Sequence, residues 1–181
     1  MLLERLQIPF EVDRPEVDET PLPGEAPPDL VLRLSRAKAA AVAQRHPNAL
    51  IIGSDQVATI DGQILGKPGN RDNAVRQLRQ LSGRSVDFLT GACVHDARNG
   101  RQSARLVPCS VGFRTLDNAT IERYLAKEQP YDCAGSAKVE ALGIALLTRI
   151  EGADPNALIG LPLIALVDLL AEHGFDVLNP P

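Results

Sequence analysis

Hydrophobic residues follow two different spacings along this chain, and the spacing predicts where strands and helices lie. The run Leu50-Ile51-Ile52 has no polar interruption, which is typical of a strand buried on both faces. It ends at Gly53-Ser54-Asp55, so we expect Asp55 just beyond a buried strand, where α/β proteins bind ligands. The alternative is an ordinary turn acid, since glycine, serine and aspartate are common turn residues.

A helical spacing begins at Pro27-Pro28-Asp29 and predicts a helix to about Gln44. Lys38 follows Leu34 by four residues and Val31 by seven, so it shares their hydrophobic face. A lysine in this position either lies along the edge of the core or points at an anion. The spacing leaves both alternatives open.

The remaining spacings predict several further strands and helices. The dipeptide Asp61-Gly62 between the runs 57–60 and 63–65 indicates a hairpin with these two runs as its strands, and Asn70 is predicted to cap a helix. The hydrophobic helix near the C-terminus is explained more simply by core burial than by a dimer surface. Strands and helices mix throughout, which predicts an α/β or α+β fold. We expect the end of a helix at 1–6, strands at 10–12, 85–96, 101–114 and 143–150, and helices at 71–81, 117–128 and 161–173.

The segment before the first long helix is acidic and rich in proline, and Arg14 is its one basic residue. We expect most of its carboxylates to be solvated. The pair Asp18-Glu19, between Pro15 and Pro21, differs because two adjacent carboxylates on a stiff loop are suited to Mg²⁺. The acidic residues of this segment are Glu11, Asp13, Glu16, Asp18, Glu19, Glu25 and Asp29.

Two later loops carry charged residues beside glycines. In Gly66-Lys67-Pro68-Gly69 the spacing is not that of a Walker A loop, and Pro68 stands where Ser or Thr is required. Lys67 is therefore either a rigidly presented cation or an exposed turn lysine. The connection 131–143 carries Lys138 and Glu140 among small residues, which let a ligand approach the backbone closely. The alternative is a flexible surface loop.

Composition narrows the class of protein. The chain has 181 residues, and 44% of them are hydrophobic, enough for a substantial core. A net charge of −4 argues against a general nucleic-acid binder, although a few placed cations can still hold a small anion. Cys93, Cys109 and Cys133 form no metal or disulfide pattern, and no signal peptide or membrane-spanning run is visible. We therefore expect a cytoplasmic protein with no membrane partner.

Six short motifs occur in order along the chain: 15–21, Ala37-Lys38-Ala39, 53–57, Gly66-Lys67-Pro68, Ala134-Gly135-Ser136 and Gly160-Leu161-Pro162. This order resembles the Maf family of nucleoside triphosphate pyrophosphatases. Each motif is weak alone, but the resemblance covers nearly the whole chain. Gln56 after the acid, with Cys133 to Ser136 and Glu140 downstream, is similar to the subgroup that acts on 7-methyl-GTP; the dTTP/UTP subgroup usually has Thr in place of Gln56.

This resemblance implies a fold and an activity. The fold is a single domain over 1–181 with an elongated, twisted, mixed sheet, flanking helices and two lobes around a central cleft, similar to the inosine-triphosphate pyrophosphatases. The activity is cleavage between the α- and β-phosphates, which gives a nucleoside monophosphate and pyrophosphate and needs a divalent cation, Mg²⁺ or Mn²⁺. Family members are often dimers, so a homodimer is compatible with the resemblance.

The resemblance also implies roles for individual residues. Attack on a triphosphate needs charge neutralisation and an oriented water. We assign Asp55 as general base with a second role near the metal, Glu19 as a metal-assisting residue, and Lys38 and Lys67 as phosphate-binding residues. A carboxylate accepts both donors of the guanine edge, so Glu140 fits base recognition, assisted by Gln56. The competing interpretation is that Glu140 pairs with Lys138.

One departure from the family pattern leaves other functions open. Family members begin with a strand and a loop bearing Ser and Arg, before a helix that ends like Leu2 to Leu6; we therefore expect this chain to be incomplete at its N-terminus relative to the family. The phosphate-binding arginines of that loop have no counterpart here. The alternatives are a non-catalytic nucleotide-binding regulator linked to cell division, or a pyrophosphatase of the dTTP, UTP or ITP type.

Overall fold

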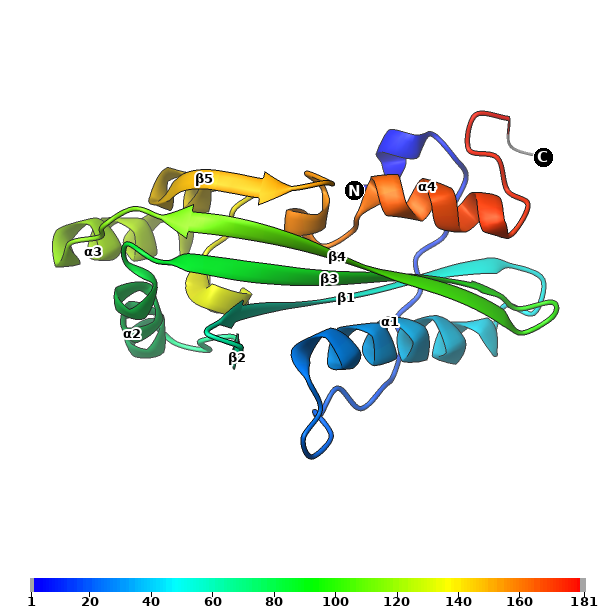
Figure 1. Cartoon of the computed structure of the whole chain (residues 1–181), viewed down its shortest axis with the longest axis horizontal. Coiled ribbons are helices and arrows are strands. Elements are labelled where there is room, and N and C mark those ends of the chain that lie inside the picture. Colours follow the sequence, from blue (N-terminus) through cyan, green and yellow to red (C-terminus); the bar gives the residue numbers. More distant parts are fainter. Residues whose placement is uncertain (1, 180–181) are drawn as a thin grey trace. The chain divides into compact units, whose positions relative to one another are not determined.

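The computed structural model describes residues 2–179 and confirms the predicted α/β fold (Figure 1). The prediction for Met1 lies outside the described residues. The four α-helices are α1 (Pro27–Ala43), α2 (Arg71–Leu81), α3 (Asn118–Glu128) and α4 (Leu163–Glu172), and the strands are β1 (Leu50–Ile60), β2 (Gln63–Leu65), β3 (Ser85–Asp96), β4 (Arg101–Phe113) and β5 (Leu147–Gly152). Short 3₁₀ segments are η1 (Leu3–Leu6), η2 (Ala134–Ser136), η3 (Leu142–Leu146) and η4 (Ala157–Ile159).

The five strands form one sheet in the order β2-β1-β3-β4-β5. β1 and β2 pair antiparallel, with Ala58 opposite Leu65, through the hairpin predicted at Asp61-Gly62. Both residues of that turn have positive φ, 51° and 75°, as a tight two-residue hairpin requires. β4 and β5 also pair antiparallel, with an irregularity between Gly112 and Phe113.

The chain divides into two compact units. The first contains the residues up to Gln56, 89–107 and the residues from Asp154 onward; the second contains 57–88 and 108–153. β1, β3 and β4 therefore each contribute residues to both units. No helix among residues 2–179 has the length and apolar character needed to cross a bilayer.

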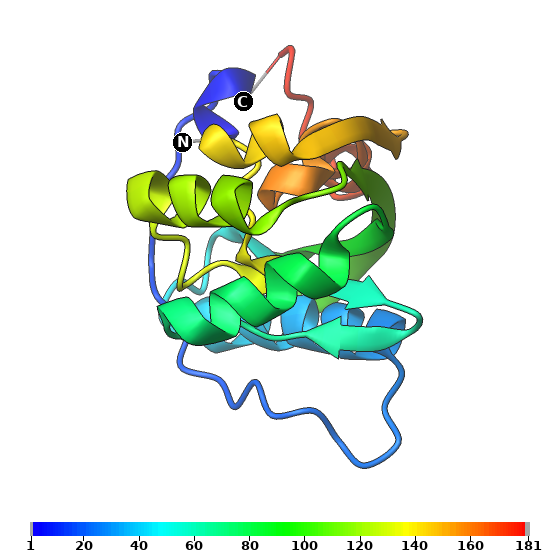
Figure 2. The ribbon, with the colours of Figure 1, turned by 90° about the vertical axis from the view of Figure 1, so that its left-hand side faces the viewer.

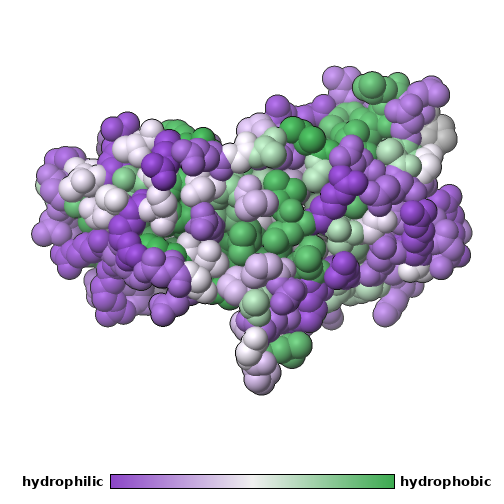
Figure 3. Space-filling view, viewed as in Figure 1, coloured by the Kyte–Doolittle hydropathy of each residue, from purple (hydrophilic) through white to green (hydrophobic). Residues whose placement is uncertain are grey.

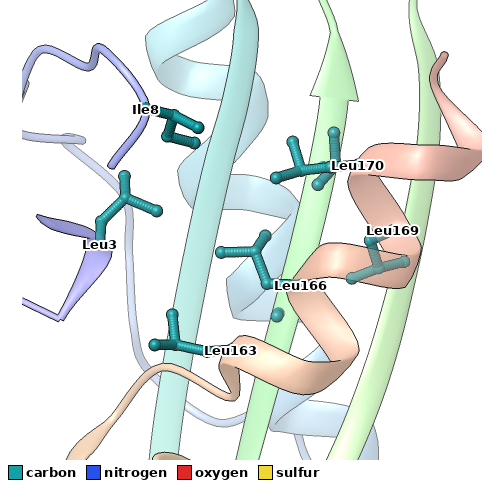
Figure 4. Packing of buried hydrophobic residues seen from close by; sticks show 8 residues of the cluster. Leu3, Ile8, Leu163, Leu166, Leu169 and Leu170 are labelled. Atoms are coloured by element: carbon teal, nitrogen blue, oxygen red, sulfur yellow. The ribbon is translucent and has the colours of Figure 1, made fainter. Parts of the chain in front are cut away.

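In the first unit, α1 and α4 cover opposite faces of the sheet (Figure 1). Ile51 and Cys93 pack with the α1 residues Ala39, Val42 and Ala43. The alternate strand positions Ala92 and Val94 pack with α4 instead. Because successive side chains of a strand point to opposite faces, this division fixes which face each residue of β1 and β3 presents. The cluster on the α4 side is Leu3, Ile8, Ala92, Val94, Leu163, Leu166, Leu169 and Leu170 (Figure 4).

This packing confirms core burial for the inward face of the C-terminal helix. Leu166 and Leu169 are almost completely buried, whereas Ile164 keeps 57% of its surface exposed. Figure 3 shows hydrophobic surface in the region of α4.

Two glycines let α1 lie directly on the sheet. A Cβ atom at Gly53 would lie 2.3 Å from the carbonyl oxygen of Ser35 and 2.8 Å from the backbone nitrogen of Ala39. At Gly91 it would lie 2.5 Å from Oγ of Ser35 and 2.8 Å from a methyl carbon of Val31. Only residues without a side chain permit this approach, so Gly53 and Gly91 set the distance between α1 and the strands beneath it.

The second unit packs α2 against α3, with η2 against α2 and η3 against α3 (Figure 2). Leu78 and Ile121 are buried members of its core. Both helices begin as predicted: the Asn70 side chain accepts a hydrogen bond from the Asn73 backbone at 3.0 Å, and Asp117 caps α3.

Three sequence predictions for strands are wrong. The strand expected to end near Asp55 and the hairpin arm at 57–60 are one continuous strand, β1, in which burial resumes at Val57. Residues 10–12 form no strand. The strand expected at 143–150 begins only at Leu147, after the 3₁₀ segment η3, and is exposed after its first residue. β5 is an edge strand, so its hydrophobic residues do not imply burial on both faces.

Candidate functional site

Asp55 and Lys38 form the centre of the candidate site in the first unit. Nζ of Lys38 on α1 lies 2.7 Å from Oδ1 of Asp55 on β1. The Asp55 side chain is 10% exposed and that of Lys38 is 18% exposed. Lys38 lies on the buried face predicted from its spacing to Val31 and Leu34, and the close approach at Gly53 brings that face onto the strand.

Glu19 brings a second carboxylate to the same ammonium group. Its Oε1 lies 2.8 Å from Nζ of Lys38, although its side chain is 58% exposed. Lys38 therefore bridges two carboxylates from segments that are distant in the sequence. Asp18, the other half of the predicted pair, accepts a hydrogen bond from the Thr20 backbone at 2.9 Å and so shapes the loop.

The surroundings shift the ionisation of both central groups. Burial raises the pKa of the Asp55 carboxyl above its ordinary value, and the hydrogen bond from Lys38 offsets only part of this effect. Burial alone would lower the pKa of the Lys38 ammonium, but the hydrogen bonds to Asp55 and Glu19 outweigh it, so the pKa is raised. Lys38 therefore stays charged, and Asp55 is a stronger base than an exposed aspartate.

The donor set fits a hard divalent cation. Glu19 and Asp55 supply carboxylate oxygens that converge on one point, now taken by the Lys38 ammonium. Residues 2–179 contain no group of three or more His, Cys, Asp or Glu side chains arranged for a metal. Mg²⁺ commonly binds through only one or two carboxylates together with water and substrate phosphates, so two carboxylates suffice for that mode.

Gln56 points away from Asp55. Its Nε2 donates to Oγ1 of Thr90 at 2.7 Å and to the carbonyl oxygen of Ala157 at 2.8 Å, with Leu158 O at 3.2 Å. Ser54, two residues earlier on the same face, donates to Gly160 O at 2.8 Å. Ser54, Gln56 and Thr90 thus tie the η4 turn to the strands.

Two residues of that anchoring network were not among the sequence predictions. Thr90 also donates its own hydroxyl to Ala157 O at 2.8 Å. Asp154 accepts the Ile164 backbone N–H at 2.6 Å and so joins the turn to the start of α4. The sequence signal for this network lies in β1, where Ser54 and Gln56 place two polar side chains on one face of an otherwise hydrophobic strand. Such side chains need polar partners on that face, and Thr90 is one of them.

Lys67 lies in the second unit, on an exposed position of a well-fixed loop. Gln77 Nε2 donates to the Gly66 carbonyl at 2.8 Å, and Asn73 Nδ2 donates to the Pro68 carbonyl at 2.7 Å. The Gly69 N–H donates to Tyr131 O at 2.9 Å. The backbone on both sides of Lys67 is therefore held by hydrogen bonds, while its side chain is exposed.

Glu140 also lies in the second unit and is exposed. The alternative in which it pairs with Lys138 is not observed, because Nζ of Lys138 lies 3.6 Å from Glu128 instead. The preceding Ala134–Ser136 turn is fixed by the buried Ser136, whose Oγ donates to Oε1 of Gln77 at 2.5 Å. Gln77 thereby joins this turn to the Lys67 loop.

The model of the family described as Maf-like protein matches residues 1–173. This chain belongs to the Maf-like family. The resemblance predicted from the six ordered motifs is confirmed.

Several curated Maf-like relatives are similar over nearly the whole chain, and each is named 7-methyl-GTP pyrophosphatase. A protein of Methylobacillus flagellatus is 58% identical over 98% of this chain and 92% of its own length. The relative in Nitrosospira multiformis is 56% identical over 97% of this chain and 89% of its own. A protein of Bordetella pertussis is 55% identical over 98% of this chain and 88% of its own length.

Proposed function

We propose that this Maf-like protein hydrolyses 7-methyl-GTP, or a related modified nucleoside triphosphate, to the nucleoside monophosphate and pyrophosphate. The name shared by its relatives supports the substrate class. The observation that carries the chemistry is the buried contact of Asp55 with Lys38, with Glu19 on the same ammonium. This arrangement combines a base of raised pKa with a cation able to bind phosphate.

In this proposal Asp55 acts as general base. It takes a proton from a water molecule, the water oxygen attacks the α-phosphorus, and the bond to the bridging oxygen breaks as pyrophosphate leaves. Lys38 and Lys67 bind phosphate oxygens and stabilise the charge that develops on them. Glu19 and Asp55 would hold the Mg²⁺ or Mn²⁺ ion, which neutralises phosphate charge when it is bound.

Base recognition is assigned to Glu140. Its carboxylate can accept both guanine donors, N1–H and the 2-amino group, and N7-methylation adds a positive charge that a carboxylate favours. We assign Gln56 an indirect part, because its amide hydrogens are already used by Thr90 and Ala157. Glu140→Gln should reduce the preference for 7-methyl-GTP over dTTP, and an unchanged preference would remove Glu140 from this role.

The function is tested by measuring pyrophosphate release with Mg²⁺ or Mn²⁺ across 7-methyl-GTP, GTP, dTTP, UTP and ITP. Highest kcat/KM with 7-methyl-GTP is the expected result. A higher value with dTTP, UTP or ITP would keep the reaction and change the base. Nucleotide binding without any pyrophosphate release would favour the nucleotide-binding regulator.

Two further expectations accompany this function. A nucleoside triphosphate substrate is consistent with a cytoplasmic protein, which fractionation would test. A homodimer is tested by light scattering on the purified protein.

A further inference from the structure

The acidic segment 13–25 is held against α1 and the turn after it by acid–base contacts of three acids, whose partners run in antiparallel order. Asp13 contacts Arg45, with Oδ2 to Nε at 2.9 Å. Glu19 contacts Lys38 at 2.8 Å, and Glu25 contacts Arg33 with Oε1 to Nε at 2.6 Å. The three acids are six residues apart in the sequence. Glu25 is an exception to the expectation that most acids of this segment are solvated, because Arg33 shields its side chain, whereas Asp13 is exposed as expected.

The three contacts differ in how firmly they are built. Arg33 forms a fork with Glu25, because Nε and NH2 donate to the two carboxylate oxygens at 2.6 and 2.8 Å. NH2 also donates to the carbonyl oxygen of Thr20 at 3.1 Å, on the residue directly after Glu19. The Glu25 side chain is only 8% exposed. A bidentate, shielded pair of this kind is stronger and more specific in geometry than a single exposed contact.

The other two contacts are too exposed to hold the segment by themselves. Asp13 also contacts His46, and Arg45 donates to the Arg14 carbonyl oxygen at 2.8 Å, but the side chains of Asp13, Arg45 and His46 are all substantially solvent-accessible. Glu19 is more than half exposed. Exposed ion pairs contribute little and are screened by salt, whereas ordering a loop opposes the contact entropically. The Glu25–Arg33 pair is therefore the anchor of the segment, and Arg33 also donates a hydrogen bond to the backbone of Thr20, beside Glu19.

We infer that Arg33 and Glu25 are positioning residues that hold Glu19 beside Lys38 and Asp55, and that they thereby set the affinity of the site for a divalent cation. The inference rests on the proposed function, in which Glu19 helps to hold the cation. In this inference Arg33 and Glu25 act by holding the segment in place and are not themselves ligands of the cation.

The test compares Arg33→Met, Glu25→Gln and the double variant with wild type. Mn²⁺ binding without nucleotide is measured by electron paramagnetic resonance, and hydrogen exchange is measured for residues 13–25. Each single variant should bind Mn²⁺ about 10–100-fold more weakly, the usual range for outer partners of metal ligands. Exchange of the segment should rise, and the double variant should be no worse than either single one, because both changes break the same fork.

Arg105→Met is the matched control. Arg105 also contacts two carboxylates, Asp168 and Glu172 on α4, at 2.6 and 2.7 Å, so its removal costs the same charge and similar surface contacts. The control should leave Mn²⁺ affinity and exchange of 13–25 at wild-type values. Equal Mn²⁺ affinity and equal exchange of 13–25 in Arg33→Met and Arg105→Met would overturn the inference. If wild type still releases pyrophosphate in that case, the proposed function stands. The exchange measurement needs no cation or substrate, so it tests the anchor even in a protein that proves inactive.

Discussion

Asp55 and Gln56 are adjacent in the sequence, and their side chains leave β1 on opposite faces. Asp55 meets Lys38 of α1, whereas Gln56 meets Thr90 and the η4 turn. The period of two along a strand produces this separation. The two residues therefore have different partners: Asp55 is the general base of the proposed function, and Gln56 anchors the η4 turn on the other face.

Gln56→Glu should destabilise the protein. The new carboxylate would face the carbonyl oxygens of Ala157 and Leu158 and lose two donated hydrogen bonds, a change of about 1–3 kcal/mol in the free energy of unfolding. The loss should be greater at pH 8 than at pH 5, because only the protonated carboxyl can donate. Urea unfolding at the two pH values measures it. Gln63→Glu, at an exposed position of β2, is the control, and equal effects at both positions would contradict the anchoring role.

Asp55→Asn should abolish turnover and keep nucleotide binding. The amide preserves the shape of the side chain but cannot take a proton, and loss of a general base commonly lowers kcat about 10²–10⁴-fold. Pyrophosphate release gives kcat, and calorimetry gives the nucleotide Kd. Asp87→Asn changes an exposed carboxyl of β3 and should leave kcat unchanged. Wild-type turnover in Asp55→Asn would show that another group is the base.

Lys38→Met should lower activity and yet strengthen cation binding in the absence of nucleotide. The Lys38 ammonium neutralises Asp55 and Glu19. Its removal leaves two neighbouring negative charges, and a bound cation would remove the repulsion between them. We expect Mn²⁺ to bind at least about tenfold more tightly, equivalent to about 1.4 kcal/mol. Lys127→Met on the exposed surface of α3 is the control. Weaker Mn²⁺ binding in Lys38→Met would show that the ammonium and the cation do not compete.

Two aspartates of the first unit should titrate differently, with the pKa of Asp55 above and that of Asp13 below the ordinary value of an aspartate. Burial raises the pKa of Asp55, whereas hydrogen bonds from Arg45 and then His46 hold the pKa of Asp13 far below its usual range. Carbon NMR of the two carboxyls, with Asp55→Asn and Asp13→Asn to assign the signals, measures both. Titration of both at the same pH would refute the assigned environments.

The same shifts predict how rate and stability depend on pH. The deprotonated form of Asp55 is the base, so kcat/KM should fall as the pH drops through its raised pKa. The depressed pKa of Asp13 gives a contribution to stability that is present above the unfolded value and is lost as the pH falls through the folded one. Rate profiles and acid unfolding of Asp13→Asn measure the two effects separately.

Gly53→Ala should reduce both stability and activity. The added methyl group would meet backbone atoms of Ser35 and Ala39, which move only if α1 moves away from β1 and takes Lys38 with it. Overpacking of this kind typically changes the free energy of unfolding by about 1–3 kcal/mol. Gly66→Ala, with no neighbouring atom within 4 Å and an ordinary φ, is the control for stability. Equal stability of the two variants would contradict the close approach.

Local sequence signals predicted much of this fold because they report interactions between near neighbours. The hairpin at Asp61-Gly62 and the cap at Asn70 each depend on two or three adjacent residues, and both are confirmed. Lys38 was placed on the correct helix face by its spacing alone. The roles assigned to individual site residues remain proposals.

The unpredicted features depend on partners that are distant in the sequence. Nothing near Glu25 indicates that Arg33 shields it, and nothing near Gly53 indicates that Ser35 will lie against it. The continuity of β1 through Asp55 was missed because Ser54, Asp55 and Gln56 separate its two hydrophobic runs, and burial resumes only at Val57. The edge position of β5 likewise depends on the strand order of the whole sheet.

The anchoring of β1 has a consequence for biosynthesis. Ser54 and Gln56 bind carbonyl oxygens that follow them by 106 and 101 residues. A nascent chain synthesised only as far as β5 already contains Asp55, Lys38, Lys67 and Glu140. It still lacks the η4 turn, to which Ser54 and Gln56 of β1 donate hydrogen bonds. These contacts cannot form before the turn has been synthesised, and closing so long a loop is entropically costly. Nucleotide hydrolysis should therefore begin only when residues 157–170 have left the ribosome, so translation itself delays the onset of activity.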